Sequence, residues 1–189
     1  MNKVKFGLRN VKYSKITIGE NGKYEYATPV AIPGGVNLSL SPSGETNDFF
    51  ADDVIYFSDT TNQGYEGDLE IALVPESFLI DIMGQTKDKN GALLENADSI
   101  SAPFALAFEV QGDKRARRTW LYNCSATRTN QDASTKETST SPSTETLTLK
   151  AMPRISDKAV KASLELNETN AAVYNSFFDS VYESEISEI

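Results

Sequence analysis

The chain of 189 residues contains no histidine and a single cysteine, Cys124. Without histidine it cannot build a Ser-His or Cys-His catalytic pair, and it lacks the most common side-chain ligand of metal ions. One cysteine excludes an internal disulfide and a cysteine-rich zinc site. No apolar run approaches the roughly 20 residues that span a bilayer. We therefore expect no cofactor, no metal and no membrane partner.

Positive charge is scarce and unevenly placed. The 18 Lys and Arg residues stand against 27 Asp and Glu residues, a net charge of -9, which argues against a general nucleic-acid binder because such proteins need a basic face. Residues 24–86 and 162–189 contain no base, whereas residues 1–23 and 114–118 are basic. This polarity is either a solvated surface with chance clustering or the mark of a subunit whose acidic and basic faces meet in an assembly.

Apolar and polar residues alternate with a period of two along most of the chain, and this pattern predicts about nine strands. We expect them over residues 4–9, 13–18, 24–31, 36–41, 69–73, 104–110, 120–126, 146–151 and 160–166. Asn21 and Gly22 predict a hairpin turn, because both residues tolerate a positive φ. Half-buried strands joined by short turns are typical of an antiparallel β-sandwich or partial barrel, here as a single domain over residues 1–189.

Two segments show helical spacing. The first runs from Pro75, a favoured residue at a helix start, to Gly84, a favoured residue after a helix end. The second is a C-terminal helix near residues 168–184, with Asn167 as its cap. Its apolar stripe consists of Ala171, Tyr174, Phe178, Val181 and Tyr182. Both stripes favour packing against a core or an interface over ligand binding.

Two further segments fit neither pattern. Residues 43–65 combine five acids with five aromatic residues, and a structureless loop of that length in a compact domain is usually functional. Residues 125–148 contain thirteen Ser or Thr residues, which we interpret as two Thr-rich strands around a flexible polar tip near residues 130–143.

Paired carboxylates are the one catalytic ingredient that the sequence offers. Asp52 and Asp53 are adjacent, and Glu66, Asp68 and Glu70 share one strand face, so either group resembles the acid and base of a glycosidase. The three on one face should repel one another unless they face water or a basic neighbour. We therefore expect no enzymatic activity.

A binding module is the alternative from a different class. A carbohydrate-binding or adhesive β-sandwich would use exposed aromatic side chains as platforms for sugar rings. Tyr56, Tyr65 and Trp120 are the candidates for that role.

Five stretches, taken in order, are distinctive as a set. They are VKFGLRNVKYSKIT, ATPVAIPGGVNLSLSPSGE, FFADDVIYFSDTTNQGYEGDLEIALVPESFLIDIMG, FALAFEV with WLYNCSATR, and ETLTLKAMP. With these stretches, most of the chain resembles the major tail protein family of long-tailed, non-contractile bacteriophages, the subunits of the tail tube.

This resemblance implies a β-sandwich with a flanking helix that forms stacked hexameric rings. The inner sheets of six subunits would join into one β-barrel around a lumen. The implied partners are other copies of the chain, the tape-measure protein in the lumen, and the tail terminator and tail-tip or baseplate proteins. DNA would pass through without specific binding. The implied location is the tail tube of the virion, assembled in the bacterial host cytoplasm.

Three sets of residues follow as candidates for assembly. Polar and acidic strand residues suit a lumen that must not hold DNA, since like charges repel. The candidates for the lumen are Asn37, Ser39, Ser41, Glu70 and Glu109. The candidates in a loop that contacts the neighbouring ring are Phe49, Phe50, Asp52, Asp53, Tyr56, Phe57 and Tyr65. The candidate charges between subunits are Lys114, Arg115, Arg117 and Arg118.

Overall fold

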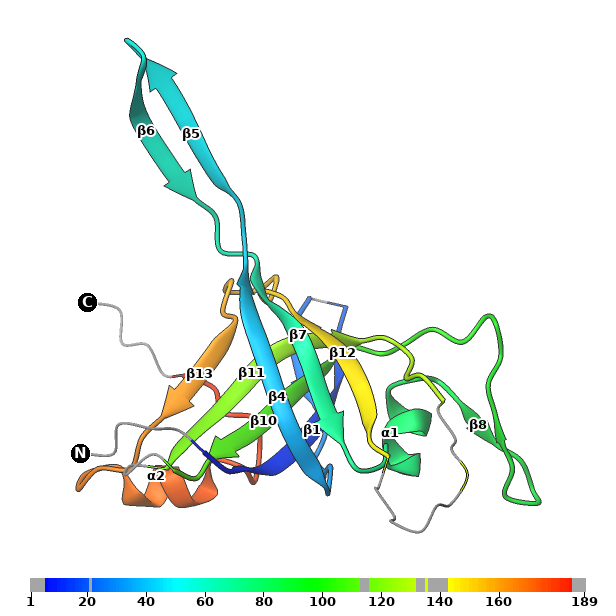
Figure 1. Cartoon of the computed structure of the whole chain (residues 1–189). Helices are drawn as coiled ribbons and strands as arrows, with labels where there is room; N and C mark the ends of the chain where they lie inside the picture. Colours follow the sequence, from blue (N-terminus) through cyan, green and yellow to red (C-terminus); the bar gives the residue numbers. More distant parts are fainter. Residues whose placement is uncertain (1–5, 21, 113–115, 132–134, 136–142, 185–189) are drawn as a thin grey trace.

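The computed structural model describes residues 6–20, 22–112, 116–131, 135 and 143–184. In this part of the chain a nine-stranded antiparallel sheet dominates (Figure 1). Its strands are β1 (Leu8–Ile18), β2 (Tyr24–Tyr26), β3 (Val30–Ala31), β4 (Gly35–Ser43), β7 (Gly64–Ile71), β10 (Phe104–Val110), β11 (Arg117–Ala126), β12 (Glu145–Ala151) and β13 (Lys161–Leu164). Their order is β2-β1-β10-β11-β12-β7-β4, with β3 paired to β1 and β13 to β11. The expectation of a mainly β, antiparallel fold is confirmed.

Smaller elements complete the described fold. Two separate hairpins are formed by β5 (Thr46–Ala51) with β6 (Val54–Thr60), and by β8 (Thr86–Lys87) with β9 (Leu93–Leu94). The two helices are short, α1 (Glu76–Asp81) and α2 (Ala171–Ser176).

The large sheet curls so that the start of β4 approaches β1. A Cβ atom on Gly35 would lie 3.1 Å from Cγ2 of Val11, so the missing side chain permits this approach. Within the described residues β4 and β1 do not pair, so the sheet is curled but is not a closed barrel. The main core lies inside the curl, where the Phe78 ring of α1 packs edge-on against Tyr13 and Phe104 at centroid distances of 5.1 and 5.3 Å.

A second apolar cluster lies on the opposite face of β10 and β11. Alternate residues of a strand point to opposite faces, so Phe104 and Leu106 enter the main core while Ala105 and Ala107 face outward. The small alanine side chains leave room for the Phe177 ring, which follows α2 and packs in the same cluster. Strand β10 is therefore buried on both faces.

The structure corrects several strand boundaries. The strands expected over residues 4–9 and 13–18 are one strand in the described region, because β1 continues through an irregularity where Asn10 has φ 53°. The expected hairpin pairs β1 with β2, with Ile18 opposite Tyr24. The strand expected over residues 24–31 is divided into β2 and β3, with Pro29, which has no backbone N–H, between them.

The helices also differ in extent. Helix α1 occupies most of the predicted segment, directly after Pro75. The C-terminal helix predicted near residues 168–184 is only α2, because the chain turns at Phe177 and continues without helical structure. The predicted cap, Asn167, is wrong, because the N-cap of α2 is Asn170. The side chain of Asn167 instead accepts a hydrogen bond of 2.9 Å at Oδ1 from the backbone N–H of Asn170.

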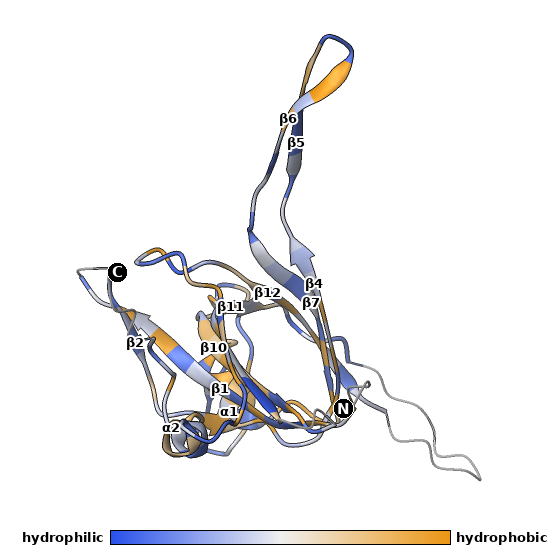
Figure 2. Ribbon diagram, turned by 90° about the vertical axis from the view of Figure 1, so that its left-hand side faces the viewer, coloured by the Kyte–Doolittle hydropathy of each residue, from blue (hydrophilic) through white to orange (hydrophobic). Residues whose placement is uncertain are grey.

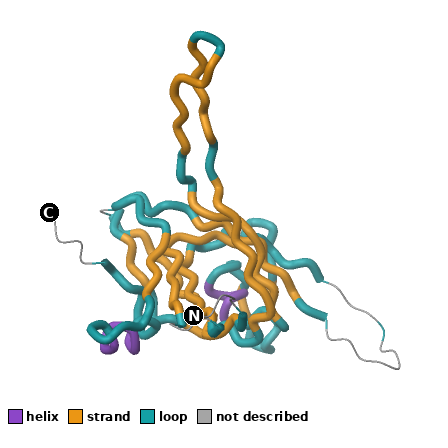
Figure 3. Tube along the Cα trace, turned by 60° about the vertical axis from the view of Figure 1, so that its left-hand side comes forward, coloured by secondary structure: helices purple, strands orange, loops and turns teal. Residues whose placement is uncertain are grey.

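Residues 43–65 are not a structureless loop. Most of this segment is the β5–β6 hairpin, which continues outward from β4 and β7 and stands away from the rest of the molecule (Figures 1 and 3). We call residues 44–61 the arm. Period-two analysis missed both of its strands, as well as β8 and β9.

Candidate assembly surfaces

The outward face of β4, β7 and β12 is a polar array of three rows. In register, Asn37 lies opposite Glu70 and Glu70 opposite Thr146; Ser39, Asp68 and Thr148 form the second row; Ser41, Glu66 and Lys150 form the third. We call these nine residues the polar face. The alternate residues Leu38, Leu69 and Leu147 point the other way, toward the main core. Period-two patterning therefore orients all three strands.

Hydroxyl groups accommodate the neighbouring carboxylates on the polar face. Thr148 Oγ1 donates a hydrogen bond of 2.8 Å to Asp68, and Thr144 Oγ1 donates one of 2.6 Å to Glu70. Glu66 lies opposite Lys150, so the face carries three acids and one base. Gly67 lets β4 approach closely, since a Cβ atom there would lie 1.9 Å from the carbonyl oxygen of Ser39.

Glu109 does not lie on this face, and its side chain is fully buried in the subunit. It pairs with Arg9 and Arg118 and accepts a hydrogen bond of 3.0 Å from the Asn10 amide. The expectation that Glu109 lines a channel is therefore wrong. Burial raises the pKa of Glu109, but the hydrogen bonds from Arg9 and Asn10 and the two positive charges outweigh burial and lower it below its ordinary value.

Arg118 also acts within the subunit. Its Nε atom lies 3.2 Å from the Glu109 carboxylate, and its guanidinium lies 4.1 Å from the centroid of the Tyr174 ring. Arg117 forms an ion pair with Glu165. These partners come from the C-terminal segment and from β10. Lys114 and Arg115 lie outside the described residues, as does most of the Ser/Thr-rich tip near residues 130–143.

The arm exposes its apolar side chains on both faces. Phe49 lies opposite Phe57 across the two strands, and both rings are about 60% exposed. Phe50 and Tyr56 are exposed as well, together with Val54 and Ile55, which were not singled out from the sequence. Figure 2 shows the hydrophobic stretch near the outer end of the arm. Exposed apolar patches of this kind are typical of interaction surfaces.

The turn of the arm is formed by Asp52 and Asp53, with φ values of 52° and 61°. Two successive positive φ values are typical of the tight hairpin turn that favours Asp, Asn and Gly. The carboxylates therefore lie at the tip of the arm, beside the apolar residues. The whole arm contains five acids and no base.

Tyr65 is not part of the arm, although it belongs to the same candidate set. It lies on β7, half-buried, where its Oη atom accepts a hydrogen bond of 2.6 Å from Lys161 on β13. Trp120 is fully buried and donates a hydrogen bond of 2.8 Å to the carbonyl oxygen of Phe177. The expectation that Trp120 forms an exposed platform for a sugar is therefore wrong.

The described residues contain no group of three or more Cys, Asp or Glu side chains arranged to hold a metal ion. No described helix is both long and apolar enough to cross a membrane. The paired carboxylates from the sequence lie at the tip of the arm and on the polar face.

A mainly β chain with a projecting hairpin that exposes apolar side chains has the features expected of a structural protein that contacts other chains. Comparison with family models specifies the class further. A model described as phage tail tube protein matches residues 1–140, so the chain belongs to the phage tail tube protein family. A search of curated proteins found no match. Membership gives the chain a structural role in the phage tail, as a component of the virion.

Proposed function

We propose that the chain assembles with copies of itself into stacked hexameric rings that form the channel for DNA ejection. The polar face carries this proposal. It combines three acids, five uncharged polar residues and one base on adjacent strands, and no described side chain covers it. A negatively charged wall repels the phosphate backbone, so DNA can pass without being held.

The sheet edge supports ring formation. In the described structure β4 pairs only with β7, so beyond Gly35, which packs against Val11 of β1, its other edge is unpaired. Proteins normally protect such an edge, and a strand from the next subunit would cover it and continue the sheet around a ring. In this arrangement Asn37, Ser39, Ser41 and Glu70 face the lumen, and Glu66 and Asp68 join them.

The arm supports contact between rings. It projects beyond the sheet that carries the polar face (Figure 1). Its apolar side chains are left exposed by its own subunit. In the assembled tail, the tape-measure protein would occupy the lumen, and the terminator and tail-tip or baseplate proteins would bind the tube ends. Assembly would take place in the host cytoplasm.

Electron microscopy of the purified chain tests the proposal. We expect rings or tubes, either spontaneously at high concentration or after addition of a tail-tip complex. A protein that stays monomeric under both conditions would contradict self-assembly. The alternative, a sugar-binding module, predicts hits on a glycan array from a protein that does not assemble.

A further inference from the structure

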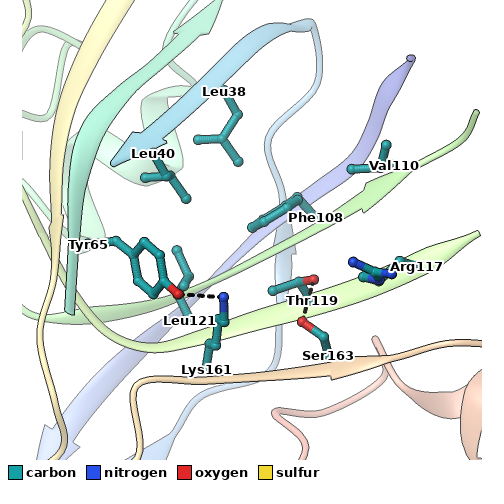
Figure 4. Close-up of a pocket in the computed structure, with 10 residues that line it drawn as sticks. All are labelled: Leu38, Leu40, Tyr65, Phe108, Val110, Arg117, Thr119, Leu121, Lys161 and Ser163. Atoms are coloured by element: carbon teal, nitrogen blue, oxygen red, sulfur yellow. Dashed lines mark hydrogen bonds between the residues drawn. The ribbon is translucent and has the colours of Figure 1, made fainter. Parts of the chain in front are cut away.

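A cleft of about 330 Å³ opens where β11 changes its neighbour. Strand β11 pairs with β13 over residues 118–121 and with β12 over residues 124–126. Strands β12 and β13 pair with different parts of the same edge of β11. The sheet formed by β12, β7 and β4 therefore diverges from β13, and the cleft lies between that sheet and β13. Figure 4 shows side chains from both walls pointing into this space.

The cleft has an apolar floor and a cation, Lys161, at its rim. Leu38 and Leu40 of β4 face Phe108 and Leu121 across the cleft. Leu38, Leu40 and Phe108 are only partly buried, at the open end of the main core. Lys161 lies at the rim, 4.4 Å from the centroid of the Tyr65 ring, whereas Arg117, farther along the same wall, is ion-paired with Glu165. An apolar side chain entering here would extend the existing core.

We propose that this cleft receives the tip of the arm of a second copy of the chain. The proposal rests on the proposed function, because it names where the arm binds in the neighbouring subunit. The exposed rings of the arm match the apolar floor. Asp52 and Asp53 at the turn would lie near Lys161 at the rim. The tip therefore complements the cleft in both charge and apolar surface.

The occupant must come from another subunit. The arm is paired along its length, from Thr46 opposite Thr60 to Ala51 opposite Val54, and it points away from the rest of its own subunit (Figure 3). Pairing continues through the base of the arm into β4 and β7, where Ser43 lies opposite Gly64, so the tip cannot fold back onto its own cleft without breaking this ladder. A contact between two different surfaces of identical chains repeats from copy to copy, which suits a stack.

A second groove is a poorer receptor for an acidic tip. This groove, of about 300 Å³, lies beside α1 and is lined by Leu79 and Met83. Its charged lining residues are Glu95, Glu145 and Arg128, and Arg128 is ion-paired with Glu95. The surplus of acid would repel Asp52 and Asp53, whereas the cleft beside β13 offers Lys161.

Cysteine cross-linking tests the contact directly. Cys124 is fully buried, so it should not compete with introduced thiols. Val54→Cys places a thiol at the tip, and Ser163→Cys places one at the rim of the cleft. We expect a disulfide-linked dimer when the two single variants are mixed, and a ladder of larger species from the double variant. Leu94→Cys, on the exposed β9, is the matched control for Ser163→Cys.

The outcomes separate the two proposals. Tubes in which the cysteines at positions 54 and 163 do not cross-link would overturn the cleft proposal and leave tube assembly intact. An equal yield of cross-link between position 54 and the control position 94 would have the same meaning. Wild-type protein that forms neither rings nor tubes, with no cross-link in the mixture, would overturn both.

A charge exchange provides a second readout. Lys161→Glu should reduce the sedimenting tube fraction at least about tenfold, while rings persist. Combining it with Asp52→Lys and Asp53→Lys should restore stacking. Lys89→Glu, an exposed site on the β8–β9 turn, makes the same charge change and should leave the yield of tubes unaltered. A sedimenting tube fraction of the Lys161→Glu variant equal to that of the wild type would refute the proposal.

Discussion

The carboxylate of Glu109 lies 3.2 Å from Nε of Arg118, directly across the β10–β11 pair, and its side chain is fully buried. Arg118 is only 17% exposed and also donates a hydrogen bond to the carbonyl oxygen of Tyr174. This pair therefore joins the sheet to α2. With Arg9 on β1 as the third member, it connects three regions of the chain.

Replacing Glu109 should destabilise the subunit. Glu109→Gln leaves the partly buried Arg118 without its charged partner, and breaking such a pair typically costs about 3 kcal/mol. Urea unfolding monitored by tryptophan fluorescence measures the change, because Trp120 is fully buried on β11, the strand that carries Arg118. The ion pair between Arg117 and Glu165 is more exposed than the pair between Arg118 and Glu109, so Glu165→Gln should cost less than about 1 kcal/mol. Equal losses in the two variants would contradict this difference.

Stability should also depend on Glu109 in acid. Since its folded pKa is below the ordinary value of 4.5, it contributes stability that is fully present above that value. This contribution is lost as the pH falls through the folded pKa, because the unfolded chain then binds the proton more readily. Urea midpoints between about pH 6 and about pH 3 should therefore fall more steeply for the wild type than for Glu109→Gln. Parallel profiles would show that Glu109 does not titrate in this way.

Amide hydrogen exchange should distinguish the free arm from the assembled one. A two-stranded ribbon without a covered face is marginally stable, so amides of β5 and β6 should exchange within about tenfold of the unfolded rate in free subunits. In tubes we expect that exchange to slow by at least about 100-fold. Amides of β10, which is buried on both faces, are the internal reference. Strong and equal protection of the arm in both states would rule out its role in assembly.

Reversing the charge of the polar face should make the tube bind DNA. Glu66→Lys, Asp68→Lys and Glu70→Lys together convert three acids and one base into four bases. Filter binding of short DNA to assembled tubes should then show salt-sensitive retention, with a slope of about -0.9 for each phosphate contacted. Tubes of the wild type should retain none.

A matched variant controls for net charge. Glu20→Lys, Asp98→Lys and Glu168→Lys change the total by the same amount at exposed positions away from the polar face. Retention by this control equal to that of the polar-face variant would contradict the placement of the face in the lumen.

Sequence patterning succeeded where a strand has one buried and one exposed face. Leu38, Leu69 and Leu147 alternate with polar neighbours, and the pattern correctly oriented β4, β7 and β12. It failed for the arm because both faces of a ribbon are exposed, so nothing imposes alternation. Phe49 and Phe50 are adjacent for that reason, and so are the four apolar residues from Val54 to Phe57.

Burial by distant segments was beyond the reach of local patterning. Alternation places Glu109 on the same face of β10 as Ala105 and Ala107, which suggested an exposed site. That face is covered, because α2 and the following residues pack on it and Arg9 and Arg118 enclose the carboxylate. Trp120 was misjudged for the same reason, since Phe177, 57 residues later, accepts its hydrogen bond.

The sequence by itself determined the class of fold, the absence of histidine chemistry and the family, because these depend on composition, local periodicity and the order of motifs. Only the tertiary structure decided which carboxylates share a surface and which are neutralised inside the subunit. It aligned Glu66 and Asp68 with Ser41 and Ser39 of β4 and Glu70 with Asn37, and it enclosed Glu109 between two arginines. The physical reason is that strand register and long-range burial depend on partners far away in the chain, which no local pattern specifies.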